Sequence, residues 1–123
     1  MMRPIVATIS SRALQHNLTA VKQHAPRSKI MAVVKANGYG HGLLNVAHSL
    51  NAADGFAVLG VNEAIVLRDA GFRQTILLLE GVFCAEELLA AADYNIDIVV
   101  HSRLQLKMLL SAALARPVHV HLK

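Results

Sequence analysis

Short, continuous apolar runs alternate along this chain with helical stripes of apolar residues. The runs are rich in valine, isoleucine and leucine, which is typical of strands buried on both faces. They predict strands at residues 5–9, 30–34, 56–60, 75–79, 96–100 and 118–122. Between the runs, apolar residues recur at intervals of three and four positions, which indicates amphipathic helices. These helices are expected at 11–25 (capped by Ser10 or Ser11), 43–53, 62–71 (capped by Asn62), 85–93 and 102–115 (capped by Ser102).

From residue 30 onward, strands recur at roughly 20–27-residue spacing, the rhythm of βα units that build a parallel sheet. Such units form either an open, doubly wound sheet or a barrel. No G-x-G-x-x-G sequence follows the first strand, which argues against a dinucleotide-binding open sheet. The last strand favours the barrel, because apolar side chains there alternate with His119, His121 and Lys123 and could leave a polar row at a barrel mouth. The expected fold is therefore α/β, a partial (β/α)8 TIM-type barrel of parallel strands alternating with helices, truncated after about six strands.

Composition and charge narrow the function classes. Hydrophobic residues make up 54% of the 123 residues, yet no apolar run approaches the ~20 residues that a membrane helix requires. The first ten residues lack the apolar core of a signal peptide, so we expect a cytoplasmic protein. The net charge of +4 comes from lysines and arginines that are scattered along the chain. This argues against a nucleic-acid-binding function and suits the binding of a small anionic ligand. A single cysteine, Cys84, excludes an internal disulfide and offers no metal-binding spacing.

A lysine stands where a predicted strand gives way to a glycine-rich turn. Lys35 follows the strand at 30–34, and Gly38, Gly40 and Gly42 precede the next helix. Burial penalises the ammonium form of a lysine, and a neutral amine can attack an aldehyde to form a Schiff base. The glycines would let backbone N–H groups approach an anion, helped by the positive end of the next helix. Tyr39 adds a hydroxyl, and an amine beside an anion cradle suits pyridoxal phosphate.

The same lysine has a plainer interpretation. It could extend along an apolar strand to water beside an ordinary βα turn. A phosphate-binding P-loop is excluded, because in that motif the lysine follows the glycines and precedes serine or threonine.

The ten residues from Val33 to Gly42, VVKANGYGHG, resemble the pyridoxal-phosphate attachment motif of alanine racemase at every position. Residues 57–68, 76–81 and 119–123 resemble later segments of the same family. The resemblance covers nearly the whole chain. It implies that residues 1–123 are the N-terminal portion of a pyridoxal-phosphate-binding (β/α)8 barrel domain, and that the family's C-terminal β domain is absent from these residues.

This resemblance implies a role for each matching residue. Lys35 would carry the cofactor covalently and act as the catalytic base on one face of the substrate. Tyr39 would hydrogen-bond the phosphate, and Leu79 would lie beside the cofactor ring. Lys123 matches a lysine that many members carry in N-carboxylated form, bridged to an arginine beyond this chain.

The implied activity is the interconversion of L-alanine and D-alanine by removal and return of the α-proton, used in bacteria for cell-wall synthesis or alanine catabolism. In this family the second acid/base is a tyrosine of the partner subunit, which implies a homodimer and a fragment without turnover alone.

Two alternatives remain. One is a pyridoxal-phosphate-binding module without catalysis. The other is a metal-dependent barrel hydrolase that uses His119 and His121; we expect no metal, because a site requires more than two ligands.

Overall fold

A computed structural model of the chain describes residues 3–123, which form one parallel sheet and its covering helices. The strands are β1 (Met31–Val33), β2 (Gly55–Val58), β3 (Thr75–Leu78), β4 (Asp97–Val100) and β5 (Val120–Leu122). The helices are α1 (Ser11–His24), α2 (Lys35–Tyr39), α3 (Leu43–Ser49), α4 (Val61–Asp69), α5 (Ala85–Asp93) and α6 (Arg103–Ser111). None of the helices in this part of the chain combines the length and apolar character that crossing a membrane requires.

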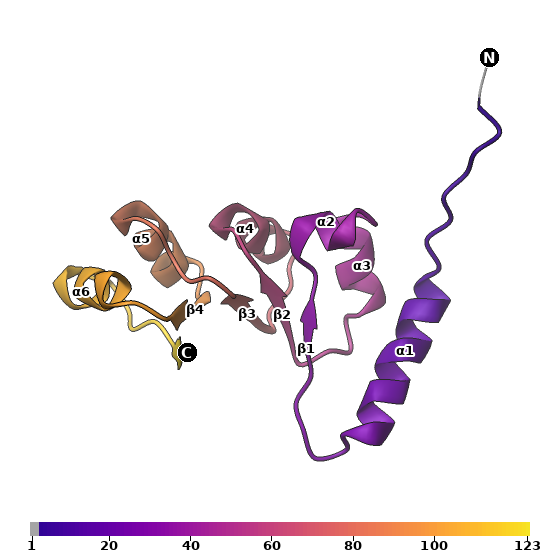
Figure 1. Cartoon of the computed structure of the whole chain (residues 1–123), viewed down its shortest axis with the longest axis horizontal. Coiled ribbons are helices and arrows are strands. Elements are labelled where there is room, and N and C mark those ends of the chain that lie inside the picture. Colours follow the sequence, from indigo (N-terminus) through magenta and orange to yellow (C-terminus); the bar gives the residue numbers. More distant parts are fainter. Residues whose placement is uncertain (1–2) are drawn as a thin grey trace.

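The order of the strands confirms the partial barrel. The sheet runs β1-β2-β3-β4-β5, and each strand pairs in parallel with the strand that follows it. Helices α3 to α6 lie along one side of this row of strands (Figure 1). A doubly wound sheet would instead reverse its strand order and carry helices on both faces. Consecutive parallel strands with helices outside are the arrangement of a barrel wall.

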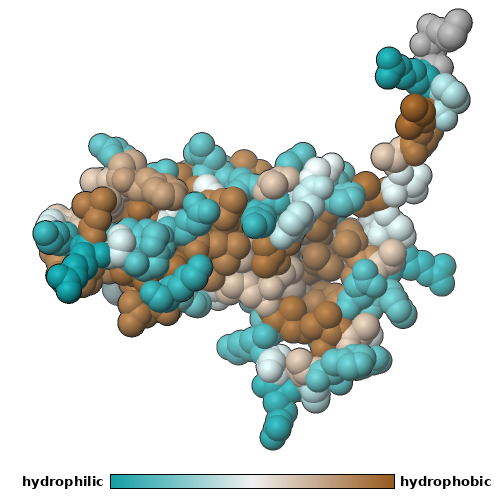
Figure 2. Space-filling view, viewed as in Figure 1, coloured by the Kyte–Doolittle hydropathy of each residue, from teal (hydrophilic) through white to brown (hydrophobic). Residues whose placement is uncertain are grey.

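The strand expected at residues 5–9 is wrong. Residues 3–10 form no strand, and Ile5 and Val6 are 81% and 83% exposed. Figure 1 shows this segment leading away from the helices and strands, and in Figure 2 it carries apolar side chains in the open. A strand needs a neighbouring strand to pair its backbone groups, and no described strand lies beside this segment. The described residues therefore hold five strands where the sequence predicts six.

The other differences between the predicted and the observed elements concern where helices begin and end. Ser10 caps α1 by accepting a hydrogen bond from the Ala13 N–H at 3.1 Å, and Ser102 caps α6 as expected. The cap of α4 is Gly60 rather than Asn62. Helix α3 ends at Ser49 and α6 at Ser111, each four residues before the expected end. Apolar spacing continues past both ends, so periodicity alone extends these helices too far.

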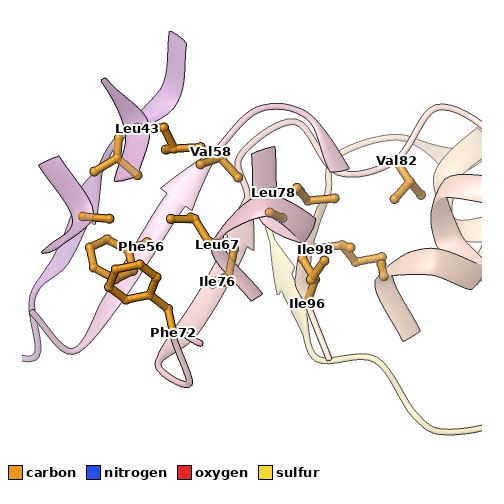
Figure 3. Packing of buried hydrophobic residues seen from close by; sticks show 14 of the residues in the cluster. Leu43, Phe56, Val58, Leu67, Phe72, Ile76, Leu78, Val82, Ile96 and Ile98 are labelled. Carbon is orange, nitrogen blue, oxygen red and sulfur yellow. The ribbon is translucent and has the colours of Figure 1, made fainter. Parts of the chain in front are cut away.

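The main core lies between the sheet and the helices (Figure 3). Phe56 and Ile76 from the strands and Leu67 from α4 are all fully buried there. The rings of Phe56 and Phe72 meet edge to face with centroids 5.3 Å apart. Strand alternation sends the intervening residues to the other face, which would be the inside of a complete barrel. There the small apolar cluster consists of Ala57, Leu77 and Val99, with Met31 and Leu79 packed against it.

The connection from β1 to α3 has an unusual backbone. Within α2, Ala36, Asn37 and Gly38 have φ of 53°, 55° and 62° and ψ of 51°, 44° and 42°, so the turn winds in the left-handed sense. Tyr39 continues it at φ 56°. A left-handed conformation costs roughly 1–2 kcal/mol for each residue other than glycine, so the surrounding contacts must hold this turn in place.

Asn37 supplies two of the contacts that hold the turn. Its Oδ1 accepts from the Leu43 N–H at 2.9 Å, which caps the start of α3, and its carbonyl accepts from the Gly42 N–H at 2.9 Å. Gly38 is buried against Val46 of α3, and a Cβ at Gly38 would lie 2.9 Å from Val46 Cγ2. The sequence motif therefore specifies a backbone shape as well as a set of functional groups.

At the opposite end of the sheet, Arg68 joins two loops. Its guanidinium donates to the carbonyls of Phe72 and Gln74 before β3, at 2.9 and 2.7 Å. It also donates to the carbonyls of Tyr94 and Asn95 before β4, at 2.9 and 2.6 Å. One planar side chain thus fixes the amino ends of two neighbouring strands.

We expect Arg68→Ala to lower the free energy of unfolding by about 2–3 kcal/mol, because four carbonyls lose a charged donor. Burial, followed by the charge of nearby Arg73, lowers the pKa of Arg68, which fits its confined position. Urea denaturation of the two variants Arg68→Ala and Arg73→Ala gives the measurement. Arg73 is exposed, so its loss should change stability little; equal stability of both variants would contradict the role given to Arg68.

Gly38→Ala should destabilise the protein by roughly 2–3 kcal/mol, since the new methyl group strains the backbone and collides with Val46. Gly40→Ala is the matched variant, because Gly40 also has positive φ but a Cβ there meets nothing within 4 Å. Backbone strain alone should lower the free energy of unfolding of Gly40→Ala by about 1 kcal/mol. Thermal unfolding of both proteins measures the difference, and an equal loss would contradict the packing argument.

Candidate active site

Lys35 and Leu79 lie at the carboxyl end of the parallel sheet and in the same register row. Hydrogen bonds extend the ladder beyond the strands, from Val34 N–H to the Ala57 carbonyl and from Leu79 N–H to the Val58 carbonyl, both at 2.9 Å. Continuing the register of β1, β2 and β3 sets Lys35 level with Leu79, two strands away. Strand spacing then separates their Cα atoms by about 10 Å. Catalytic groups of barrels are displayed at this end of the strands.

The surroundings of Lys35 are only partly apolar. Val34, just before it, is fully buried, whereas Lys35 itself is half-buried. Neither of the two ion pairs formed within residues 3–123 involves this lysine. Lys35 therefore lies at the edge of the sheet, and the burial expected from the sequence is only partial.

The turn contributes less to anion binding than the sequence suggests. The amide of Gly38 donates to the Val34 carbonyl at 2.9 Å, and the amides of Gly40 and Gly42 also donate to carbonyls of this segment. The left-handed turn therefore uses the amides of these three glycines internally. The glycines instead permit positive φ. Tyr39 is 58% exposed and offers its hydroxyl to solvent next to the turn.

Leu79 belongs to an apolar surface beside this edge of the sheet. It is half-buried and packs against the inner cluster of Ala57, Leu77 and Val99. These side chains face away from the helices, on the surface that would line a barrel. A flat ring held near Lys35 would meet apolar side chains here.

Glu63 is a site residue that sequence reasoning missed. Its Oε1 accepts from the Asn37 N–H at 3.3 Å, within the left-handed turn that follows Lys35. Its Oε2 accepts from the N–H groups of Leu59 and Gly60 at 3.3 and 3.4 Å, before α4. The spacing from Gly60 to Glu63 is that of a capping box, which predicts the contacts with the helix start but not the contact with Asn37.

A second polar residue, Gln105 of α6, is buried and joins the next two loops. Its Nε2 donates to the Glu80 carbonyl at 2.8 Å, and its Oε1 accepts from the His101 N–H at 2.8 Å. Gly81 is required beside it, because a Cβ there would collide with the carbonyl oxygen of Val99. This contact fixes the loop that begins at Leu79.

The polar residues of β5 lie beside an acidic residue of β4. His121 Nε2 lies 2.9 Å from Asp97 Oδ2, and His119 Nδ1 lies 3.8 Å from Asp97 Oδ1. The two histidines therefore face a carboxylate at the start of β4, and the register sets His121 level with Val99, in the row that continues to Leu79. Within residues 3–123, no three His, Cys, Asp or Glu side chains are grouped to hold a metal ion. Lys123 is exposed directly after β5, and its N–H donates to the Val100 carbonyl at 3.1 Å.

Comparison with known proteins identifies relatives along most of the chain. A family model described as the N-terminal domain of alanine racemase matches residues 9–123. Alanine racemase from Shewanella sediminis is 53% identical over 117 residues, which are 95% of this chain and 33% of that protein. Alanine racemase from Nitrosomonas eutropha is 57% identical over 111 residues, 90% of this chain and 31% of that protein. The chain thus spans about a third of the length of these curated relatives.

Solved structures agree with the sequence relatives. A biosynthetic alanine racemase from Pseudomonas aeruginosa superposes with a TM-score of 0.92 and 42% identity over 97% of this chain and 34% of that one. An alanine racemase from Corynebacterium glutamicum gives a TM-score of 0.83 and 40% identity over 92% of this chain and 33% of that one. Since both kinds of likeness run along nearly all of these residues, the chain belongs to the alanine racemase family.

Proposed function

We propose that residues 1–123 are the N-terminal portion of the barrel domain of a pyridoxal-phosphate-dependent alanine racemase, an isomerase that interconverts L-alanine and D-alanine. The observation that carries this proposal is the position of Lys35, which is half-buried at the carboxyl end of β1 where a left-handed turn begins. Relatives that share about half of its residues bear the name alanine racemase.

The groups at this edge suit the cofactor. Lys35 offers the primary amine that an aldehyde requires, Tyr39 offers a hydroxyl for a phosphate oxygen, and Leu79 offers apolar surface for a ring. Because the glycine amides are occupied within the turn, Tyr39 is the phosphate contact that we assign to this chain.

Lys35 would perform two tasks. Its Nζ would hold the cofactor covalently until the amine of alanine takes its place. The freed Nζ, still next to the substrate, would then accept the α-proton on one face or return it. When bound, the cofactor withdraws electrons from the α-carbon and makes its proton easier to remove.

Inversion also needs a proton donor on the opposite face of the α-carbon. By family resemblance this is a tyrosine from the C-terminal domain of a partner subunit, and the two tyrosines of this chain, Tyr39 and Tyr94, do not match it. We therefore propose a cytoplasmic homodimer as the active form, and we expect residues 1–123 alone to lack turnover. A binding module without catalysis would load the cofactor yet fail to racemise alanine as the full-length gene product.

Lys35→Ala should abolish covalent attachment of pyridoxal phosphate, because the amine is lost. Borohydride reduction of the loaded full-length protein, followed by peptide mass mapping, should find the reduced adduct on the peptide that contains Lys35. Lys29→Ala is the control, since Lys29 is exposed at the opposite end of β1 and its loss should leave the adduct in place. An adduct that persists in Lys35→Ala would contradict the proposal.

Lys123 is proposed to carry an N-carboxyl group, as its match to the family implies. The full-length protein supplied with carbon-13 bicarbonate at neutral pH should then give a carbamate signal in its NMR spectrum. Lys123→Arg should remove that signal, whereas Lys107→Arg, on the exposed face of α6, should retain it. A wild-type spectrum without a carbamate would remove this modification from the proposal.

A further inference from the structure

We propose that Glu63 is a positioning residue for Lys35, acting through the backbone of the turn that follows it; this inference rests on the proposed function. Glu63 lies in the first turn of α4, and Figure 1 shows α4 next to α2. Its two carboxylate oxygens divide between two segments of backbone. Oε1 accepts from the Asn37 N–H at 3.3 Å, and Oε2 accepts from the Leu59 N–H at 3.3 Å.

The contact with Asn37 matters because of where the left-handed turn begins. The first N–H groups of any helical turn have no carbonyl partner inside that turn. The amides of Gly38 and Gly40 donate to carbonyls of the turn, whereas the acceptor that Asn37 N–H finds is the Glu63 carboxylate. A negatively charged acceptor therefore stabilises the turn at the second residue after Lys35.

The contact with Leu59 extends this effect to the next strand. Leu59 follows β2 and lies level with both Lys35 and Leu79 when the register is continued. The carboxylate therefore ties the ends of β1 and β2 together. Ala36 and Asn37 hold strained, positive φ angles, and such angles persist only where contacts force them. Without Glu63, the backbone next to Lys35 loses one of these contacts, and its amine should occupy a wider range of positions.

A neighbouring βα unit supplies a matched control. Glu87 occupies the corresponding position in α5, three residues after its N-cap Cys84, and its Oε2 accepts from the Phe83 N–H at 2.7 Å. Both glutamates brace the start of a helix, but only Glu63 also holds the turn after Lys35. Removing either carboxylate thus removes a contact at the start of a helix. Only removing Glu63 also removes the contact with the turn after Lys35.

The test compares Glu63→Ala, Glu63→Gln and Glu87→Ala in the full-length protein, loaded with pyridoxal phosphate. We expect Glu63→Ala to lower the rate of borohydride trapping at Lys35 and the affinity for pyridoxal phosphate by about tenfold or more, since small misplacements of a reacting group are costly. The pH at which the visible absorbance of the bound cofactor changes should also shift. Glu63→Gln retains one oxygen for Asn37 and should recover most of both properties. Glu87→Ala should match wild type in both, although thermal unfolding should detect its lost helix contact.

The outcomes separate this inference from the function on which it rests. A wild-type protein without a reducible adduct at Lys35 would overturn both. A wild-type adduct, together with trapping and absorbance in Glu63→Ala that equal those of Glu87→Ala, would overturn the positioning role alone. Should Glu63→Ala not fold, Glu63→Asp takes its place, since its shorter side chain cannot span both segments; wild-type trapping in that variant would likewise overturn the role.

Discussion

The site depends on one constraint: the chain must leave β1 in a left-handed turn before it can enter α3. L-residues avoid this conformation, yet Ala36, Asn37 and Tyr39 all adopt it. Side-chain contacts that hold it include the Asn37 Oδ1, which accepts from the first N–H of α3, and the packing of Gly38 against Val46. A further one is the Glu63 carboxylate, which accepts from the Asn37 N–H. The placement of Lys35 is thus determined by tertiary structure as well as by its own strand.

The parallel sheet determines which residues lie close to that turn. Consecutive parallel strands bring their carboxyl ends to one edge, so that Lys35 and Leu79 share a row although they are far apart in the sequence. The helices pack on the outer face and leave the inner face with a small apolar cluster. The main core and the candidate site therefore occupy different faces of the same strands.

Elements that an apolar run or a capping side chain marks could mostly be predicted from the sequence. The five described strands and the caps at Ser10 and Ser102 follow from apolar runs and side-chain chemistry. The motif around Lys35 was enough to predict membership of the alanine racemase family. Residues 5–9 show the limit, since an apolar run becomes a strand only when another strand lies beside it. Sequence spacing could not reveal the roles of Glu63, Arg68 and Gln105. Their hydrogen-bond partners are backbone groups of other βα units, which are far away in the sequence. The left-handed path of the turn could not be predicted, because apolar periodicity says nothing of the handedness of a turn.

Helix α4 carries Glu63 in its first turn and Arg68 in its last. One end contacts the turn that follows Lys35, and the other holds two loops at the opposite edge of the sheet. Barrels generally keep chemistry at the carboxyl edge and robustness at the amino edge. Because a single short helix reaches both edges, substitutions near Arg68 can change thermal stability without touching the turn beside Lys35, whereas substitutions near Glu63 affect both the helix start and that turn.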